Sequence, residues 1–156
     1  MPKIEVSSVA EVKGSGYPVP FDEPCRKRSR RRLGDAGGLT QFGVNLLTLE
    51  PGAWSSQRHW HSAEDEFVYV ISGEVVLVTD RGEESLKAGD CAAFPKNDGN
   101  GHHLMNKSGL PAVLIEVGTR APGDDFCHYP DIDLQIDGRR EAFEHRDGTP
   151  YPKRQR

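Results

Sequence analysis

The chain has 156 residues, 35% of them hydrophobic, which is the size of one domain that buries a core without disulfide staples. Its 20 Lys and Arg residues against 24 Asp and Glu residues give a net charge of −4, which provides no general attraction to nucleic acid or to an anionic membrane. The 3 cysteines form no CxxC pair, the N-terminus does not resemble a signal peptide and no apolar run could span a bilayer, so we expect a cytoplasmic protein.

Residues 1–40 are predicted to form an arm outside the main fold, because prolines within 18–24 interrupt any regular element. Six of the seven residues in 26–32 are basic. Such a run indicates a nucleic-acid or phosphate contact, or a solvated segment that pairs with acids such as 64–66 or 123–125 across a dimer. Without interleaved aromatic residues we favour the second interpretation. A third is that one arginine binds an anionic substrate, since guanidinium contacts carboxylate or phosphate with two hydrogen bonds.

From residue 41 the pattern changes to short β-strands separated by turns. The stretches EFVYVI (66–71) and VVLVTD (75–80) flank Gly73 and predict a hairpin. Further strand-like stretches are 42–49, 53–60, 85–95, 102–106 and 112–118. About eight short strands at close spacing predict an all-β sandwich, jelly roll or barrel.

The remainder of the chain, 119–156, is polar and interrupted by proline and glycine. It is predicted to be a second arm with one short helix near 138–144. The expected organisation is therefore an N-terminal arm (1–40), a β-barrel (41–118) and a C-terminal arm (119–156).

The stretch RHWHSAEDEF (58–67) contains the main candidate site. His59 and His61 are two apart on a predicted strand, so both imidazoles project from one face, with Cα atoms roughly 6.8 Å apart. The polar residues that follow can turn the chain back, which places Glu66 close to His61. Two histidines alone are more often surface or core residues than ligands, but a carboxylate across a turn and a second histidine-bearing strand favour a metal site.

The further nitrogen donor of this site has two candidates. His102 has the parity of Leu104 on the strand 102–106, and His103 has the opposite parity. Because either side chain could face the interior, strand periodicity alone does not choose between them.

These residues resemble the two motifs of the cupin superfamily, over about residues 42–118. The first motif is matched by Gly52, His59, His61, Glu66 and Gly73, with a gap from Gly52 to His59 that is one residue longer than usual. The second motif is matched by Gly89, Pro95, Gly99, His102 and Asn106. Three residues separate Pro95 from Gly99 where one is usual. The spacing from His102 to Asn106 matches the motif, so the resemblance selects His102 as the ligand.

The resemblance implies a jelly-roll barrel with irregular terminal arms, a homodimer, and one divalent transition metal. Its ligands would be His59, His61, Glu66 and His102. Three imidazoles and one carboxylate suit Fe, Mn, Ni, Zn or Cu. We expect a metal-dependent enzyme acting on a small organic substrate, as a dioxygenase, an isomerase such as a sugar-phosphate isomerase, or a lyase. The alternative is a non-catalytic cupin that binds a sugar or sugar phosphate.

No second acid–base pair is evident in the sequence, so the catalytic residues are left unassigned. Secondary candidates, which would contribute only if the arms or a long loop fold over the barrel mouth, are His128, His145, Tyr69, Tyr129 and Asp98. For each of them a surface polar role is the more frequent one. Cys91, in CAAF, is interpreted as a small buried core residue.

Overall fold

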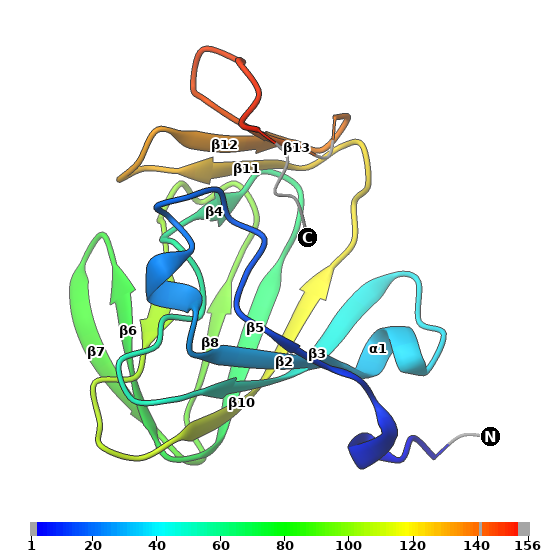
Figure 1. Cartoon of the computed structure of the whole chain (residues 1–156), viewed down its shortest axis with the longest axis vertical. Coiled ribbons are helices and arrows are strands. Elements are labelled where there is room, and N and C mark those ends of the chain that lie inside the picture. Colours follow the sequence, from blue (N-terminus) through cyan, green and yellow to red (C-terminus); the bar gives the residue numbers. More distant parts are fainter. Residues whose placement is uncertain (1–2, 141, 153–156) are drawn as a thin grey trace.

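The computed structural model describes residues 3–140 and 142–152, and these residues form three antiparallel β-sheets (Figure 1). The largest sheet contains β1 (Glu11–Lys13), β2 (Arg28–Arg32), β3 (Phe42–Leu49), β10 (Ala112–Thr119), β5 (Glu66–Ser72) and β8 (Cys91–Phe94), in that spatial order. A second sheet contains β7 (Gly82–Lys87), β6 (Glu74–Thr79) and β9 (His103–Met105). The third contains β13 (Ala142–Glu144), β12 (Leu134–Asp137), β11 (Phe126–Tyr129) and β4 (Trp60–His61).

Helical structure is confined to single turns in the described part of the chain. These are the 3₁₀-helices η1 (Val6–Ser8) and η2 (Glu23–Cys25) and the short α-helix α1 (Leu33–Ala36). The expected all-β jelly roll is therefore confirmed. Among the described residues, no helix has the length and apolar character needed to cross a membrane.

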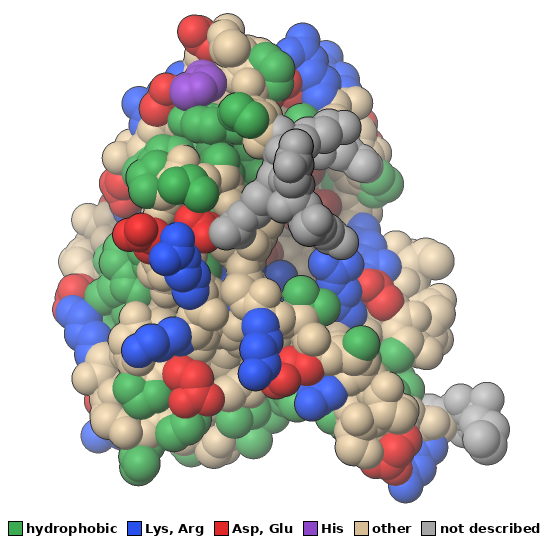
Figure 2. Space-filling view, viewed as in Figure 1, with side chains coloured by type: hydrophobic (Ala, Val, Ile, Leu, Met, Phe, Trp, Pro, Cys, Tyr) green, Lys and Arg blue, Asp and Glu red, His purple; other side chains and the backbone are tan. Residues whose placement is uncertain are grey.

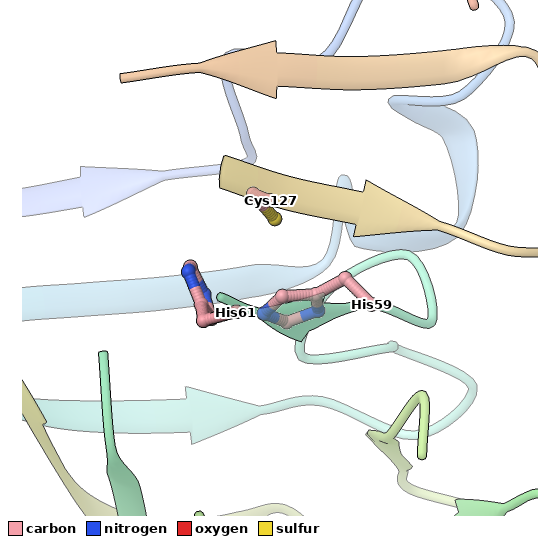
Figure 3. Close-up of side chains that lie close together, drawn as sticks. All are labelled: His59, His61 and Cys127. Carbon is pink, nitrogen blue, oxygen red and sulfur yellow. The ribbon is translucent and has the colours of Figure 1, made fainter. Parts of the chain in front are cut away.

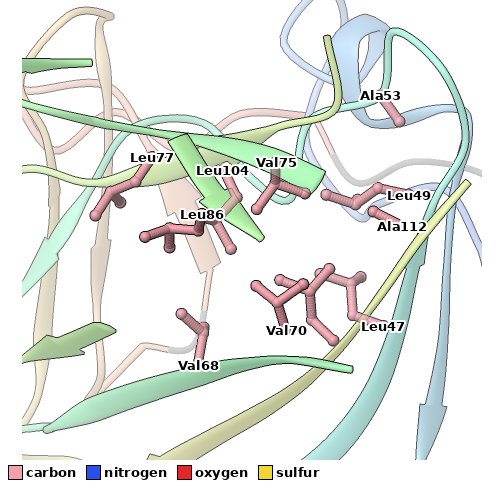
Figure 4. Packing of buried hydrophobic residues seen from close by; sticks show 11 residues of the cluster. Leu47, Leu49, Ala53, Val68, Val70, Val75, Leu77, Leu86, Leu104 and Ala112 are labelled. Carbon is pink, nitrogen blue, oxygen red and sulfur yellow. The ribbon is translucent and has the colours of Figure 1, made fainter. Parts of the chain in front are cut away.

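The first and second sheets enclose the main hydrophobic core (Figure 4). Along β5, Val68 and Val70 are buried while Phe67 and Tyr69 are exposed. This alternation follows the two-residue period of a pleated strand. The core consists of Leu47, Leu49, Ala53, Val68, Val70, Val75, Leu77, Leu86, Leu104, Ala112 and Leu114. Burial of their apolar surface holds the two sheets face to face.

The predicted hairpin around Gly73 is wrong, although both of its strands exist. β5 pairs with β10 and β8, whereas β6 pairs with β7 and β9. The chain thus passes from one sheet to the other at Gly73, which has a φ of 79°. A Cβ at this position would lie 2.8 Å from the Cα of Ala112 and 2.8 Å from the carbonyl oxygen of Pro111. Glycine is required here because the corner passes so close to the β10 backbone.

Cys91 is exposed, which corrects its interpretation as a core residue. It pairs in register with Tyr69, an outward residue of β5 that is 42% exposed. Its neighbours Ala92 and Phe94 take the inward positions and pack against the core. Strand parity decides the position of this cysteine more than its hydrophobicity does.

The two terminal segments contain more regular structure than expected. β1 and β2 extend the largest sheet beside β3. The helix expected near 138–144 is not formed, because the described residues of this stretch are a turn followed by β13. The N–H of Gly138 donates to the carbonyl of Asp125 at 2.8 Å, next to the ladder between β11 and β12, and β13 pairs in turn with β12.

A second hydrophobic cluster joins the N-terminal and C-terminal segments. It consists of Tyr17, Cys25, Cys127, Tyr129 and Leu134. The rings of Tyr17 and Tyr129 meet edge to face, with centroids 5.7 Å apart. Residues 17–25 and the strands β11 and β12 therefore pack together at the end of the barrel that carries β4 (Figure 1).

Candidate metal centre

The two chain segments that carry His59 and His102 pair through backbone hydrogen bonds. The backbone N–H of His59 donates to the carbonyl of His102 at 3.1 Å, and the reciprocal bond is 2.9 Å long. This pairing places the two imidazole centroids 4.9 Å apart. His61, two residues along the chain, has its ring centroid 5.0 Å from that of His59 (Figure 3). The His59 imidazole is therefore a neighbour of both the others, while the donor atoms of His61 group within 4.8 Å with those of His59 and Cys127 or of Glu64 and Asp125.

Glu66, the first residue of β5, supplies a carboxylate to this group. Its Oε2 lies 3.0 Å from Nε2 of His102, 3.5 Å from Nε2 of His59 and 3.6 Å from Nε2 of His61. The imidazoles of His59 and His102 are buried. The donor atoms of His59, Glu66 and His102 all lie within 4.8 Å of one another. A single metal ion could be held at this point of convergence.

In two of the three imidazoles, a contact at Nδ1 orients the ring from the side opposite the Glu66 carboxylate. Nδ1 of His59 lies 2.9 Å from the carbonyl oxygen of Gln57, and Nδ1 of His61 lies 2.6 Å from Oδ2 of Asp125. Donation by Nδ1–H leaves the lone pair of Nε2 free for a metal. Nδ1 of His102 is buried and has no hydrogen-bond partner among the described residues.

The electrostatic environment sets the protonation of the cluster. Burial opposes ionisation of Glu66, but the contacts of its carboxylate with the imidazoles of His102 and His59 outweigh it and hold the pKa of its carboxyl well below the usual range. Burial lowers the pKa of His102. Burial also acts to lower the pKa of His61, but the hydrogen bond to Asp125 and the nearby carboxylate charges outweigh it and raise that pKa. An ionised carboxylate and a neutral His102 are forms that metal binding requires.

His103 lies next to His102 but takes another environment. Its ring meets the indole of Trp54, with centroids 4.4 Å apart. Burial lowers the pKa of His103 to about 4. Among the described residues it belongs to none of the groups of donor atoms that could share a metal. Of the two alternatives that spacing leaves open, His102 is the residue that reaches Glu66.

A cavity of about 280 Å³ lies beside the candidate donors. Its lining includes Arg30 of β2 and Glu116 of β10, whose Nε and Oε2 are 3.0 Å apart. These side chains are partly buried, with 29% and 18% exposed. A Cβ on Gly118 would lie 3.6 Å from Cγ of Glu66, so the absence of a side chain there leaves space next to the carboxylate. The candidate donors and the ion pair of Arg30 and Glu116 therefore line the same cavity.

Glu116 and Asp125 are site residues that the sequence interpretation missed. Glu116 could have been found as a lone carboxylate in the apolar stretch AVLIEVG, with the same parity as the buried Leu114. Asp125 carries no comparable local signal, because only the pairing of β11 with β4 brings it to His61.

Of the secondary candidates, Tyr129 approaches the cluster most closely, with its ring stacked at 5.7 Å on that of His59. The others lie elsewhere: His128 stacks on Trp60, His145 bonds Asp133, Tyr69 is on the outer face of β5, and Asp98 is exposed in a loop.

Cys127 of β11 lies beside His59 and His61 (Figure 3). Its Sγ and one nitrogen of each imidazole lie within 4.8 Å of one another. Cys127 is 4% exposed, and burial raises the pKa of its thiol. Because the thiolate is the form that binds metals, this environment does not favour Cys127 as a ligand.

The basic run 26–32 is bonded within the molecule. Arg28 donates to the carbonyl of Gly14 at 3.0 Å, and Arg31 donates to the carbonyl of Val9. Arg30 lines the cavity beside the candidate donors. On the face shown in Figure 2, positive side chains are interspersed with negative ones. These contacts support the interpretations in which the run pairs internally or meets an anionic substrate.

Comparison with known proteins identifies a matching family model and similar solved structures. A family model described as "Cupin domain" matches residues 45–118. A crystal structure named as a sugar phosphate isomerase from a cupin superfamily, from Silicibacter pomeroyi, is 48% identical, with 97% of each chain covered and a TM-score of 0.90. A proposed sugar phosphate isomerase from Acidithiobacillus ferrooxidans is 30% identical over 84% of this chain and 80% of that chain, with a TM-score of 0.72.

A curated relative, the oxalate decarboxylase of Bacillus subtilis, is 30% identical over 140 residues. The match includes 79% of this chain but 34% of that protein. The chain therefore spans about a third of the length of this relative, and their similarity concerns one part of the larger enzyme.

Proposed function

The chain belongs to the cupin superfamily, and from this premise we propose that it is a metal-dependent enzyme acting on a small organic molecule. The proposed ligands of one divalent transition metal are His59, His61, Glu66 and His102. The observation that carries the proposal is the convergence of three Nε2 atoms within 3.6 Å of one carboxylate oxygen at the wall of a cavity. This donor set suits Fe, Mn, Ni, Zn or Cu, and a bound metal would polarise a substrate oxygen.

The proposed substrate is a small sugar phosphate. Arg30 lines the cavity, and a guanidinium binds phosphate with paired hydrogen bonds. The names of the two similar crystal structures point to the same class of substrate. A phosphate that binds Arg30 would take over the contact that Glu116 now makes, at 3.0 Å.

The proposed reaction is an aldose–ketose isomerisation, in which a proton moves from one carbon to its neighbour while the hydroxyl proton moves between the oxygen atoms on the same two carbons. Glu116, once released from Arg30, is a carboxylate in the cavity that could remove this proton and return it. Its place on β10, opposite Val68 of β5, keeps it within the same barrel wall as Glu66. The chain would then supply both an anion-binding group and a base.

The second candidate function is non-catalytic binding of a sugar or sugar phosphate. The observation in its favour is that the additional carboxylate Glu116 is engaged by Arg30. A receptor needs the anion-binding group but no proton transfer. It would be stabilised by ligand without forming product.

We also propose that the chain forms a homodimer through the outer face of the sheet β3–β10–β5–β8. One row of register partners across this face is Leu46, Ile115, Tyr69 and Cys91, and the next is Val44, Val117, Phe67 and Ala93. None of these eight described residues is charged. A flat uncharged face can meet its own copy across a two-fold axis, and an exposed apolar patch favours this arrangement.

Deuterium incorporation from D₂O into a panel of aldose and ketose phosphates, followed by NMR, tests the catalytic proposal. Metal-loaded protein should exchange deuterium into the carbon next to the carbonyl, and chelator-treated protein should not. Glu116→Gln, which keeps the size but removes the base, should slow exchange by about 100-fold or more. Arg30→Met should raise KM. Arg26→Met, at an exposed position outside the cavity, should leave both KM and the rate of exchange unchanged.

Two outcomes would overturn the proposal. Exchange that is equal with and without metal would exclude the metal-dependent mechanism. Thermal stabilisation by a sugar phosphate, with no exchange under any metal, would favour the binding function in its place.

A further inference from the structure

We propose that Asp125 is a positioning residue, which fixes the His61 imidazole for metal binding from the C-terminal segment 119–156. This inference rests on the proposed function, because it assumes that His61 is a metal ligand. It adds that the barrel alone does not complete the metal centre. A residue from outside the family-matched region 45–118 holds one of its ligands.

The carboxylate of Asp125 is held on both of its oxygens. Oδ2 lies 2.6 Å from Nδ1 of His61, and Oδ1 accepts the backbone N–H of Ala63 at 2.9 Å. The hydroxyl of Ser62 also approaches Oδ1, at 3.5 Å. The Asp125 side chain is 12% exposed. Because both oxygens are engaged, the carboxylate cannot turn without losing one of these bonds.

This contact is the shortest of the three that His61 makes with carboxylates, since Nδ1 also lies 4.0 Å from Oε2 of Glu64. Nδ1 is 2.6 Å from Asp125, whereas Nε2 is 3.6 Å from Glu66. A charge-assisted hydrogen bond weakens steeply beyond about 3.2 Å, so Asp125 should retain the proton on Nδ1. The lone pair of Nε2 is then directed at the point where the other donors converge.

The groups that contact Nδ1 of His59 and Nδ1 of His61 differ in charge. His59 is oriented by the neutral carbonyl of Gln57, but His61 faces an ionised side chain. A carboxylate partner makes an imidazole a stronger electron donor toward a metal, in addition to orienting it. Asp125 therefore affects the strength of metal binding as well as its geometry.

The fold provides a rigid frame for Asp125. β11, which begins at the next residue, pairs with β4 so that Cys127 is opposite His61. The N–H of Phe126 donates to Oγ of Ser62 at 2.7 Å. A Cβ on Gly138 would lie 2.4 Å from the carbonyl oxygen of Asp125, so the turn before β13 is packed directly against this backbone. The C-terminal segment is thereby fixed to the ligand strand.

Asp125→Asn is the direct test, with Asp124→Asn as the matched control on the exposed neighbouring residue. The amide of asparagine has one oxygen, so it cannot accept both the His61 and Ala63 protons. We expect Asp125→Asn to weaken Co²⁺ binding by about 10-fold to 100-fold, and to change the visible spectrum of the Co²⁺ protein. The control should match the native protein, and thermal unfolding of the metal-free variants checks that they fold.

The tautomer of His61 in the metal-free native protein supplies a readout that needs no variant. In ¹⁵N NMR spectra recorded well above the imidazole pKa, His61 should carry its proton on Nδ1. A proton on Nε2 would overturn the inference, as would equal Co²⁺ affinity in native protein and a folded Asp125→Asn variant. Failure of the native protein to bind any of the candidate metals would instead overturn the proposed function.

Discussion

His102 and His103 are adjacent, both buried, and placed in different environments. Nε2 of His102 lies 3.0 Å from Oε2 of Glu66, whereas the His103 ring packs on Trp54. The backbone pairing of His59 with His102 sets this difference, because successive side chains of an extended segment project to opposite sides. The choice that spacing leaves open is thus decided by a long-range contact.

Alanine substitutions separate the two roles at the residue scale. His102→Ala should weaken binding of the preferred metal by at least about 100-fold. It removes a proposed ligand, and this loss should exceed that caused by removing a residue that only hydrogen-bonds to a ligand. His103→Ala should retain the metal and destabilise the fold by about 1–3 kcal/mol through lost packing. Metal competition titration and urea unfolding of the metal-free proteins measure the two effects. Loss of metal in His103→Ala with retention in His102→Ala would contradict the assignment.

At the scale of elements, the positions of strands could be predicted from the sequence better than their pairing. The stretches 66–71 and 75–80 are strands, but they belong to different sheets. Alternation reports which residues face inward, and the buried Val68 and Val70 of β5 follow it. It does not report which strand lies alongside, because the close approach of Gly73 to β10 arises from residues almost forty positions away in the chain.

The uncharged outer face of β3, β10, β5 and β8 gives the proposed dimer a direct test. Tyr69→Glu places a charge in the middle of this face, where a partner would bury it without a counter-charge. We expect the dimer dissociation constant to rise by about 100-fold, or ~3 kcal/mol. Sedimentation velocity across a concentration series measures it. Val6→Glu, on an exposed helical turn away from this sheet, is the control. A native protein that stays monomeric throughout the series would exclude the proposal.

At the scale of the whole molecule, the proposed ligands could be predicted from the sequence, but the groups around them could not. His59, His61 and Glu66 lie within one short stretch, so local spacing is enough to associate them. Arg30 and Asp125 come from the two terminal segments, which were predicted to be arms. Their positions depend on β2 joining β3 and on β11 joining β4, and such distant pairings leave no periodic signal in a single sequence.

The central claim is that the four proposed ligands bind a transition metal. Elemental analysis of the purified protein, beside a His59→Ala/His61→Ala variant, tests it most directly, with His145→Ala as a surface control. We expect near-stoichiometric metal in the native protein and the control, and its loss from the double variant. A native protein without metal, even after incubation with Fe, Mn, Ni, Zn and Cu in turn, would contradict the account.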